Sequence, residues 1–171
     1  MGRVFVVAYD FDGSVGHHQF PGIGPPRPIV IGALQMLVDE GWRATLHTCR
    51  VNSFWPEPSR TEKCQAMLDW LYENRVPFHD AWGLLIPGRL SASDVRNRCG
   101  KARSDPYEKL YSWAFAADVG KPLADVYWDD RGVELGPGGL DRYKSPEDLA
   151  WYAKTLATAL GDPRRTGDSD V

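Results

Sequence analysis

Short apolar runs, each about as long as a β-strand, alternate along the chain with segments that have the periodicity of a helix. Strands are expected at residues 4–9, 42–48, 81–86 and 124–128. Helices are expected at residues 29–40, from 59 to before Pro77, after Ser104, and at 146–160. This alternation is typical of a parallel sheet whose helical connections cover both faces. It predicts an α/β protein with a three-layer, Rossmann-like parallel sheet.

The chain has the size and composition of one domain. Its 171 residues, 43% hydrophobic and 25% charged, can bury a core of ordinary size. We expect a single domain over residues 1–161, followed by a polar, mobile tail over residues 162–171. The formal net charge of −3 argues against a protein whose whole surface binds nucleic acid.

The cysteines and the apolar runs indicate the compartment. The three cysteines form no C-x-x-C pair, and their odd number favours free thiols over a disulfide framework. No apolar run approaches the length of roughly 20 residues that a membrane span needs. These features predict a cytoplasmic protein with no membrane partner.

Polar side chains follow three of the expected strands. They are, in chain order, Asp10 with Asp12, Thr48 with Arg50, and Asp129 with Asp130. Because the carboxyl ends of parallel strands meet at one edge of a sheet, these groups should converge there. Four like charges held close need a cation, and oxygen ligands point to Mg²⁺. Gly13 permits a turn after the first strand. One of the two aspartates could then ligate the metal and act as the nucleophile, and the other could act as acid and base.

Four short motifs follow one another along the chain. They are the strand and acids of "VVAYDFDGS", the strand ending in Thr48 of "ATLHT", Lys121, and the strand with paired acids of "ADVYWDD". Together they span residues 4–131, and their order resembles the haloacid dehalogenase (HAD) superfamily of phosphotransferases. The longer pattern also resembles small bacterial and phage proteins of the HAD-like hydrolase type. One departure is Ser14, where Thr is commoner.

The resemblance implies a role for each motif. Asp10 would attack phosphorus and form an aspartyl phosphate. Asp12 would protonate the leaving oxygen and then deprotonate the hydrolytic water. Thr48 and Lys121 would hold the phosphoryl oxygens. The Mg²⁺ ligands would be Asp10, the backbone carbonyl of Asp12, and either Asp129 or Asp130.

Substrate contacts are expected from residues near these motifs. Residues 13–28 are rich in Gly and Pro and should form a loop or small flap. We assign substrate contacts to Ser14, His17 and His18 within that segment. Arg50 is either a further substrate-binding residue or a salt-bridge partner of the acids.

The spacing of the motifs leaves little room for the cap domain that many HAD enzymes carry. We therefore expect a capless protein or one with a minimal lid. Residues 87–106, which hold the main local concentration of basic residues, are either that lid or a solvated loop.

The sequence predicts a Mg²⁺-dependent phosphomonoesterase. A nucleotide or a nucleic-acid phosphate terminus is the expected substrate, because capless HAD members often act on large substrates that cover the site themselves. Others close the site by forming a homo-oligomer, which stays an open alternative. The alternative functions are a phosphatase of sugar phosphates or other small metabolites, and a HAD-fold phosphate-binding module without turnover.

Overall fold

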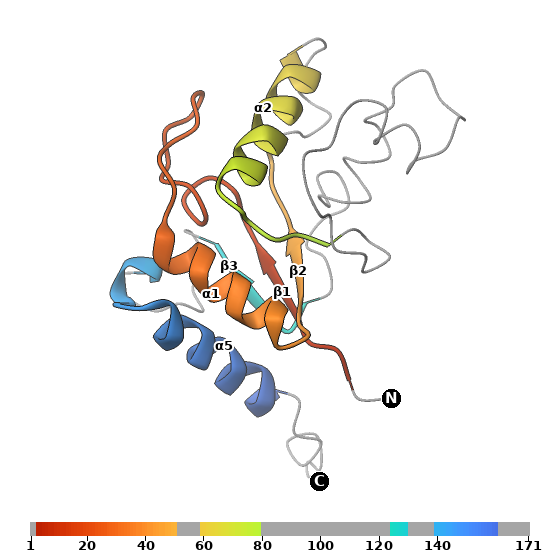
Figure 1. Cartoon of the computed structure of the whole chain (residues 1–171), viewed down its shortest axis with the longest axis vertical. Helices are drawn as coiled ribbons and strands as arrows, with labels where there is room; N and C mark the ends of the chain where they lie inside the picture. Colours follow the sequence, from red (N-terminus) through yellow and green to blue (C-terminus); the bar gives the residue numbers. More distant parts are fainter. Residues whose placement is uncertain (1–2, 51–58, 80–123, 130–138, 161–171) are drawn as a thin grey trace, which may run out of the picture.

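The core of the protein is a small parallel sheet. The computed structural model describes residues 3–50, 59–79, 124–129 and 139–160 (Figure 1). Within these residues the sheet has three strands, β1 (Val6–Tyr9), β2 (Arg43–Leu46) and β3 (Val126–Trp128). Their order is β2-β1-β3, so β1 is central. Tyr9 is in register with Leu46 on one side and Trp128 on the other.

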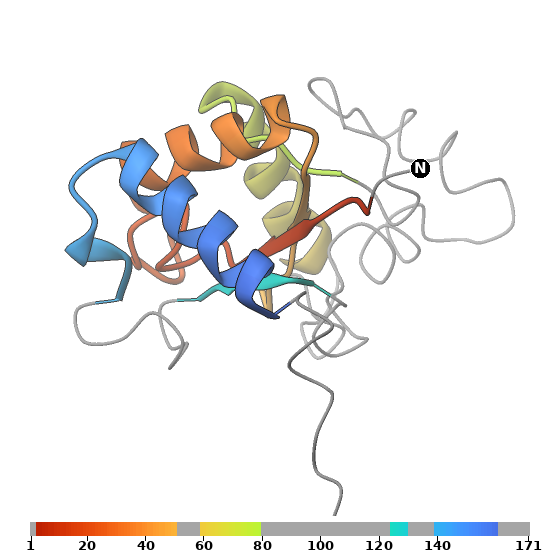
Figure 2. The ribbon, with the colours of Figure 1, turned by 90° about the horizontal axis from the view of Figure 1, so that it is seen from below.

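Helices flank the described sheet. They are α1 (Pro28–Asp39), α2 (Ser59–Glu73), α5 (Pro146–Leu160) and the 3₁₀ helix η2 (Gly139–Arg142). Figure 2 shows α1 and α5 side by side over the strands, where α1 contacts β2 and α5 contacts β3. The two helices approach closely: a Cβ on Gly32 of α1 would lie 2.8 Å from Cγ of Pro146.

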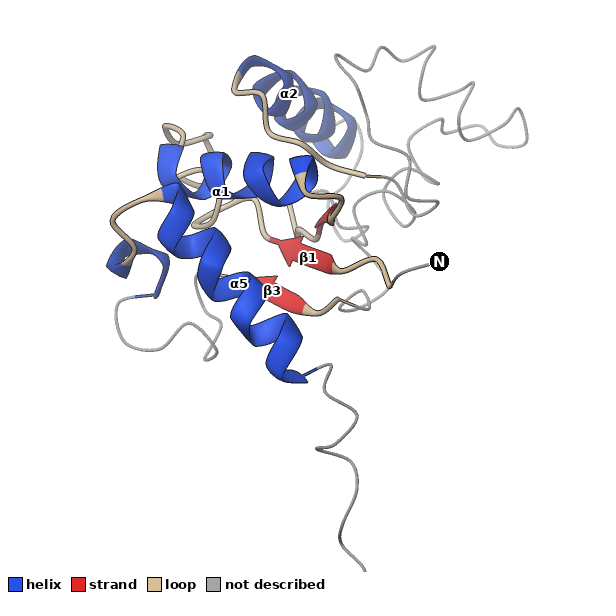
Figure 3. Cartoon of the chain, turned by 60° about the horizontal axis from the view of Figure 1, so that its bottom comes forward, coloured by secondary structure: helices blue, strands red, loops and turns tan. Residues whose placement is uncertain are grey.

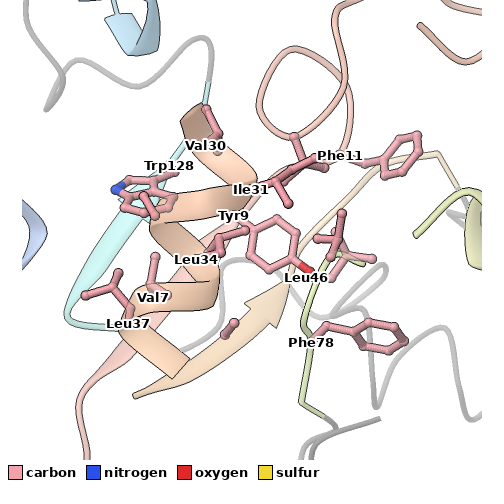
Figure 4. Packing of buried hydrophobic residues seen from close by; sticks show 14 of the residues in the cluster. Val7, Tyr9, Phe11, Val30, Ile31, Leu34, Leu37, Leu46, Phe78 and Trp128 are labelled. Atoms are coloured by element: carbon pink, nitrogen blue, oxygen red, sulfur yellow. The ribbon is translucent and has the colours of Figure 1, made fainter. Parts of the chain in front are cut away.

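The hydrophobic core lies between α1 and the sheet. Val7, Tyr9 and Leu46 are fully buried on the sheet face beneath the helix, against Leu34 of α1 (Figure 4). These strand residues alternate with others that point to the opposite face, as the pleat requires. The Tyr9 hydroxyl donates to the Pro77 carbonyl at 3.0 Å, which ties the segment after α2 to the core.

The residues after β1 form a small hairpin, residues 13–27, which we call the flap. The His17 N–H donates to the Pro25 carbonyl at 2.9 Å, and the Arg27 N–H donates to the Val15 carbonyl at 2.8 Å. A Cβ on Gly24 would lie 2.1 Å from the His17 carbonyl oxygen, so this close approach requires glycine. The flap runs directly into α1 (Figure 1).

The coarse fold prediction is confirmed, with shorter elements. Each strand begins one or two residues later than expected, and β1 and β3 end at the expected residue. The helix α1 covers almost the whole expected range, and Gly41, with φ at +89°, follows its end, where a glycine in this conformation is common. The helix α2 ends at Glu73, before Pro77 as expected, and Arg75 takes φ at +55°, a left-handed conformation. The helix α5 has the expected bounds, and the Ser145 hydroxyl caps it by accepting from the Asp148 N–H at 3.1 Å.

Several expected features lie outside the described residues. They are the strand at 81–86, the helix after Ser104, the segment 87–106 and the tail at 162–171. The described helices α1 and α5 cover one face of the sheet, so helices on both faces remain a prediction. Within the described ranges, Cys49 is exposed, Cys64 is buried, and no disulfide joins them. None of the helices described is long and apolar enough to cross a membrane.

Candidate functional site

The carboxyl ends of the three strands meet at one edge, and three polar residues lie in a row there. β1 and β3 point the same way in Figure 3. The Asp10 N–H donates to the Trp128 carbonyl, and the His47 N–H donates to the Tyr9 carbonyl, both at 2.9 Å. Asp10 therefore lies between His47 and Asp129, and all three line a small cavity of about 10 Å³. His47, to which the sequence assigned no catalytic or substrate-binding role, is half-buried in this row.

The carboxyl group of Asp10 has a strongly raised pKa. The pKa of its carboxyl is raised from 3.8 to about 7, mainly by burial and in addition by the nearby charges of Asp129 and Asp12. Hydrogen bonds from the Phe11 N–H, at 2.6 Å, and from the Thr48 hydroxyl partly oppose this rise in pKa. Three of the four carboxyl groups that the sequence predicted to converge, those of Asp10, Asp12 and Asp129, are thus close enough to interact.

Thr48 connects the end of β2 to Asp10. Its side chain is buried, and its oxygen accepts a hydrogen bond from the Arg50 N–H at 3.2 Å. A hydroxyl that accepts from one neighbour can still donate its own proton to another, here the Asp10 carboxyl. The structure therefore brings together the second-motif threonine and the first aspartate, as the sequence predicted.

Arg50 forms a buried ion pair with Asp12. Its Nε donates to Oδ2 of Asp12 at 2.9 Å, and its Nη2 donates to Oδ1. The Arg50 side chain is only 2% exposed, and that of Asp12 is 15% exposed. Of the two interpretations that the sequence left open for Arg50, the described structure has the salt bridge.

The other expected substrate contacts lie in different surroundings. Ser14 is fully buried, and its hydroxyl donates to the Trp128 carbonyl at 2.9 Å, so it joins the flap to β3. His17 lines a second cavity, of about 140 Å³, beside Arg27 at the start of α1. His18 is exposed on the flap. A substrate role for these three residues stays a prediction.

The donor atoms around Asp10 suit a hard cation, although the described side chains do not form a complete set. Among residues 3–50, 59–79, 124–129 and 139–160, no three His, Cys, Asp or Glu side chains are arranged to hold a metal ion. Arg50 occupies the Asp12 carboxylate, which leaves the backbone carbonyl of Asp12 as its metal donor. The expected contributors Asp130 and Lys121 lie outside the described residues. The crowding that raises the Asp10 pKa is the kind that a divalent cation relieves, so the residues fit Mg²⁺ chemically.

Comparisons with known proteins add little. No protein-family model matches the chain, and no curated protein matches it. Among solved structures, that of a conserved protein coded by a locus of Bacteroides thetaiotaomicron is similar, with 22% sequence identity and a TM-score of 0.47, over 90% of this chain and 92% of that chain. A similarity at this level carries no conclusion about function.

Proposed function

We propose that the chain is a HAD-type, Mg²⁺-dependent phosphomonoesterase that works through an aspartyl phosphate on Asp10. The observation that carries the proposal is the position of Asp10. Its carboxyl lies at the end of the central strand, against the Thr48 hydroxyl and within reach of the Asp12 and Asp129 charges. A half-buried acid with a strongly raised pKa, at the carboxyl edge of a parallel sheet, is a candidate functional group.

In the first half-reaction a carboxylate oxygen of Asp10 bonds to phosphorus, and the bond from phosphorus to the leaving oxygen breaks. Asp12 gives a proton to that leaving oxygen. The Thr48 hydroxyl, already directed at Asp10, is placed to donate to a phosphoryl oxygen that bonds there. Lys121 is proposed to neutralise charge on the same group.

In the second half-reaction water attacks the phosphorus of the aspartyl phosphate. Asp12 takes the proton of that water, the bond between phosphorus and the Asp10 oxygen breaks, and inorganic phosphate leaves. Asp10 regains its carboxylate, so the cycle can begin again.

Mg²⁺ would be held by the Asp10 carboxylate, the backbone carbonyl of Asp12, and Asp129 or Asp130. When bound, it would offset the combined negative charge of these acids and of the phosphoryl oxygens. The raised Asp10 pKa supports this ligand set, because an uncompensated carboxylate at that position is costly.

A nucleotide or a nucleic-acid phosphate terminus is the substrate class that we propose. The support is the sequence resemblance to capless proteins, whose open sites accept large substrates. The alternative substrates are sugar phosphates and other small metabolites. The alternative from another class, a phosphate-binding module without turnover, is disfavoured by Asp12, since binding alone needs no acid–base residue.

The test is hydrolysis of 4-nitrophenyl phosphate with Mg²⁺ and with EDTA, followed by a panel of nucleotides, sugar phosphates and 3′-phosphorylated oligonucleotides. We expect activity with Mg²⁺ that EDTA abolishes. Asp10→Asn should be inactive, while the matched exposed variant Asp39→Asn should keep wild-type rates. Equal activity in EDTA would refute the metal assignment, and an active Asp10→Asn would refute the covalent mechanism.

A further inference from the structure

The Arg50 side chain uses almost all of its hydrogen-bonding capacity inside the protein. Besides the two bonds to the Asp12 carboxylate, Nη1 donates to the Pro21 carbonyl at 3.2 Å and Nη2 donates to the Gly22 carbonyl at 2.8 Å. These four bonds engage most of the five N–H donors that a guanidinium carries. Pro21 and Gly22 form the tip of the flap, so one buried group joins the flap to the second aspartate.

Aromatic rings complete the surroundings of this guanidinium. Its carbon lies 5.2 Å from the ring centroid of Phe11 and 5.5 Å from that of Phe20. Phe11 comes from the turn after β1, and Phe20 comes from the flap. Both distances are within the range of a cation–π interaction, which favours the charge where water is excluded.

We infer that Arg50 is a positioning residue, which orients the Asp12 carboxylate and holds the flap tip beside it, and that it does not bind the substrate phosphate. This inference deepens the proposed function and rests on it for its kinetic consequences. A planar guanidinium fixes both oxygens of a carboxylate in one orientation, which a lysine cannot do. Because the pair is buried, releasing Asp12 would leave a charge without its partner, so the flap and Asp12 should move together.

Kinetics distinguish positioning from substrate binding. Arg50→Lys keeps the charge but loses the planar fork, so we expect kcat for 4-nitrophenyl phosphate to fall about 10- to 100-fold, a share of the roughly 10²–10⁴-fold that acid–base catalysis contributes. The KM and the inhibition constant of inorganic phosphate should change less than about threefold. The matched control Arg43→Lys changes an exposed arginine on β2 and should leave all three constants unchanged.

A double-mutant cycle with Asp12→Asn tests the pairing itself. If Arg50 acts through Asp12, adding Arg50→Lys to Asp12→Asn should lower kcat little further. Independent, multiplicative losses would overturn the inference. A raised KM and a weakened phosphate inhibition, with kcat preserved, would overturn it as well and make Arg50 a substrate-binding residue.

Hydrogen exchange tests the flap contact without any turnover. In Arg50→Lys the flap amides of His17 and Arg27 should exchange at least about tenfold faster, because a lost flap contact lowers the free energy of local opening. The sheet amide of His47 should keep its rate. Unchanged flap exchange would refute the flap contact. A wild-type protein that hydrolyses no phosphate ester would refute the proposed function. The hydrogen-exchange result would then be the test of whether Arg50 holds the flap.

A second variant covers the case in which Arg50→Lys does not fold. Phe20 is 40% exposed, so Phe20→Leu removes a ring from the guanidinium without leaving a buried charge unpaired. It should change kcat and flap exchange in the same directions, with a smaller amplitude. Wild-type values of both in a folded Phe20→Leu protein would count against the inference.

Discussion

Replacing Asp10 by asparagine should stabilise the metal-free protein at neutral and alkaline pH. The Asp10 pKa is raised from 3.8 to about 7 in the folded protein, first by burial and then by neighbouring carboxylates. The folded chain therefore keeps a proton that the unfolded chain has released. The protonated Asp10 side chain therefore contributes stability that is fully present below about pH 4. This contribution is lost as the pH rises through about 7, because the folded wild type must then hold a charge at this site. Asparagine resembles the protonated acid in shape and cannot ionise.

The magnitude follows from the two pKa values. A rise from 3.8 to about 7 corresponds to an upper limit of about 4 kcal/mol at alkaline pH. The site is half-buried, and partial solvation and relaxation reduce this figure, so we expect roughly 2–4 kcal/mol. At pH 4 the wild type and Asp10→Asn should differ by less than about 1 kcal/mol, since the acid is then largely protonated in the folded state.

The assay is urea unfolding in EDTA at pH 4, 5.5, 7 and 8.5, with the free energy of unfolding taken from linear extrapolation. Asp39→Asn is the matched control, because Asp39 is an exposed acid at the end of α1. Its effect should stay within about 0.5 kcal/mol at every pH. A constant difference between Asp10→Asn and wild type across the pH range, or a less stable variant at pH 8.5, would refute the assignment of a half-buried, crowded carboxyl with a raised pKa.

Mg²⁺ should make the wild type more stable than Asp10→Asn, the reverse of the order expected in EDTA. A cation that binds the folded site stabilises the wild type in proportion to its occupancy, whereas Asp10→Asn lacks a ligand and should gain less. The measurement is the thermal midpoint at pH 8 with increasing MgCl₂. Equal gains in both proteins would show that the cation binds elsewhere.

Three further substitutions test the packing around the site. Gly24→Ala places a Cβ 2.1 Å from the His17 carbonyl oxygen, so it should cost roughly 1–3 kcal/mol of unfolding free energy and accelerate amide exchange in the flap; an unperturbed flap would contradict the observed hairpin. Gly32→Ala places a Cβ 2.8 Å from Cγ of Pro146, and overpacking should outweigh the gain in helix propensity, for a net loss of about 1 kcal/mol in urea unfolding. Ser14→Ala removes one buried hydrogen bond and should cost about 1 kcal/mol of unfolding free energy; a raised KM in the same variant would support the predicted substrate contact, and an unchanged KM would count against it.

The element types were predictable because they depend on local patterns. The continuous apolar run before Asp10 indicated a strand buried on both faces, and the helical spacing of Val30, Leu34 and Leu37 indicated α1, whose core face these residues occupy. The stop of α1 near Gly41 followed from the freedom of glycine at positive φ. Pro77 placed the end of α2 before residue 77, but the exact end at Glu73 was not predictable, since Arg75 carries no comparable signal for a left-handed conformation.

Some features of the candidate site were likewise predictable from the sequence, and others were not. The approach of Asp10 to Asp12, Asp129 and Thr48 followed from the rule that parallel strands end at one edge. The partners of individual side chains did not follow from it. Nothing in the sequence distinguished an Arg50 that binds substrate from one that is buried against Asp12, or an exposed Ser14 from one that donates to the Trp128 carbonyl.

The sequence by itself determined an α/β chain with carboxylates and a threonine at strand ends, because the hydrophobic period and the residue types are local properties. The tertiary structure decided the strand order β2-β1-β3 and the direction of each polar side chain. It also placed His79 beside the outer edge of β2, where the Ala44 N–H donates to Nδ1 of His79 at 3.0 Å. Such contacts join residues 35 or more positions apart. They depend on how the flap, the strand ends and the segment after α2 pack together, which no local pattern encodes.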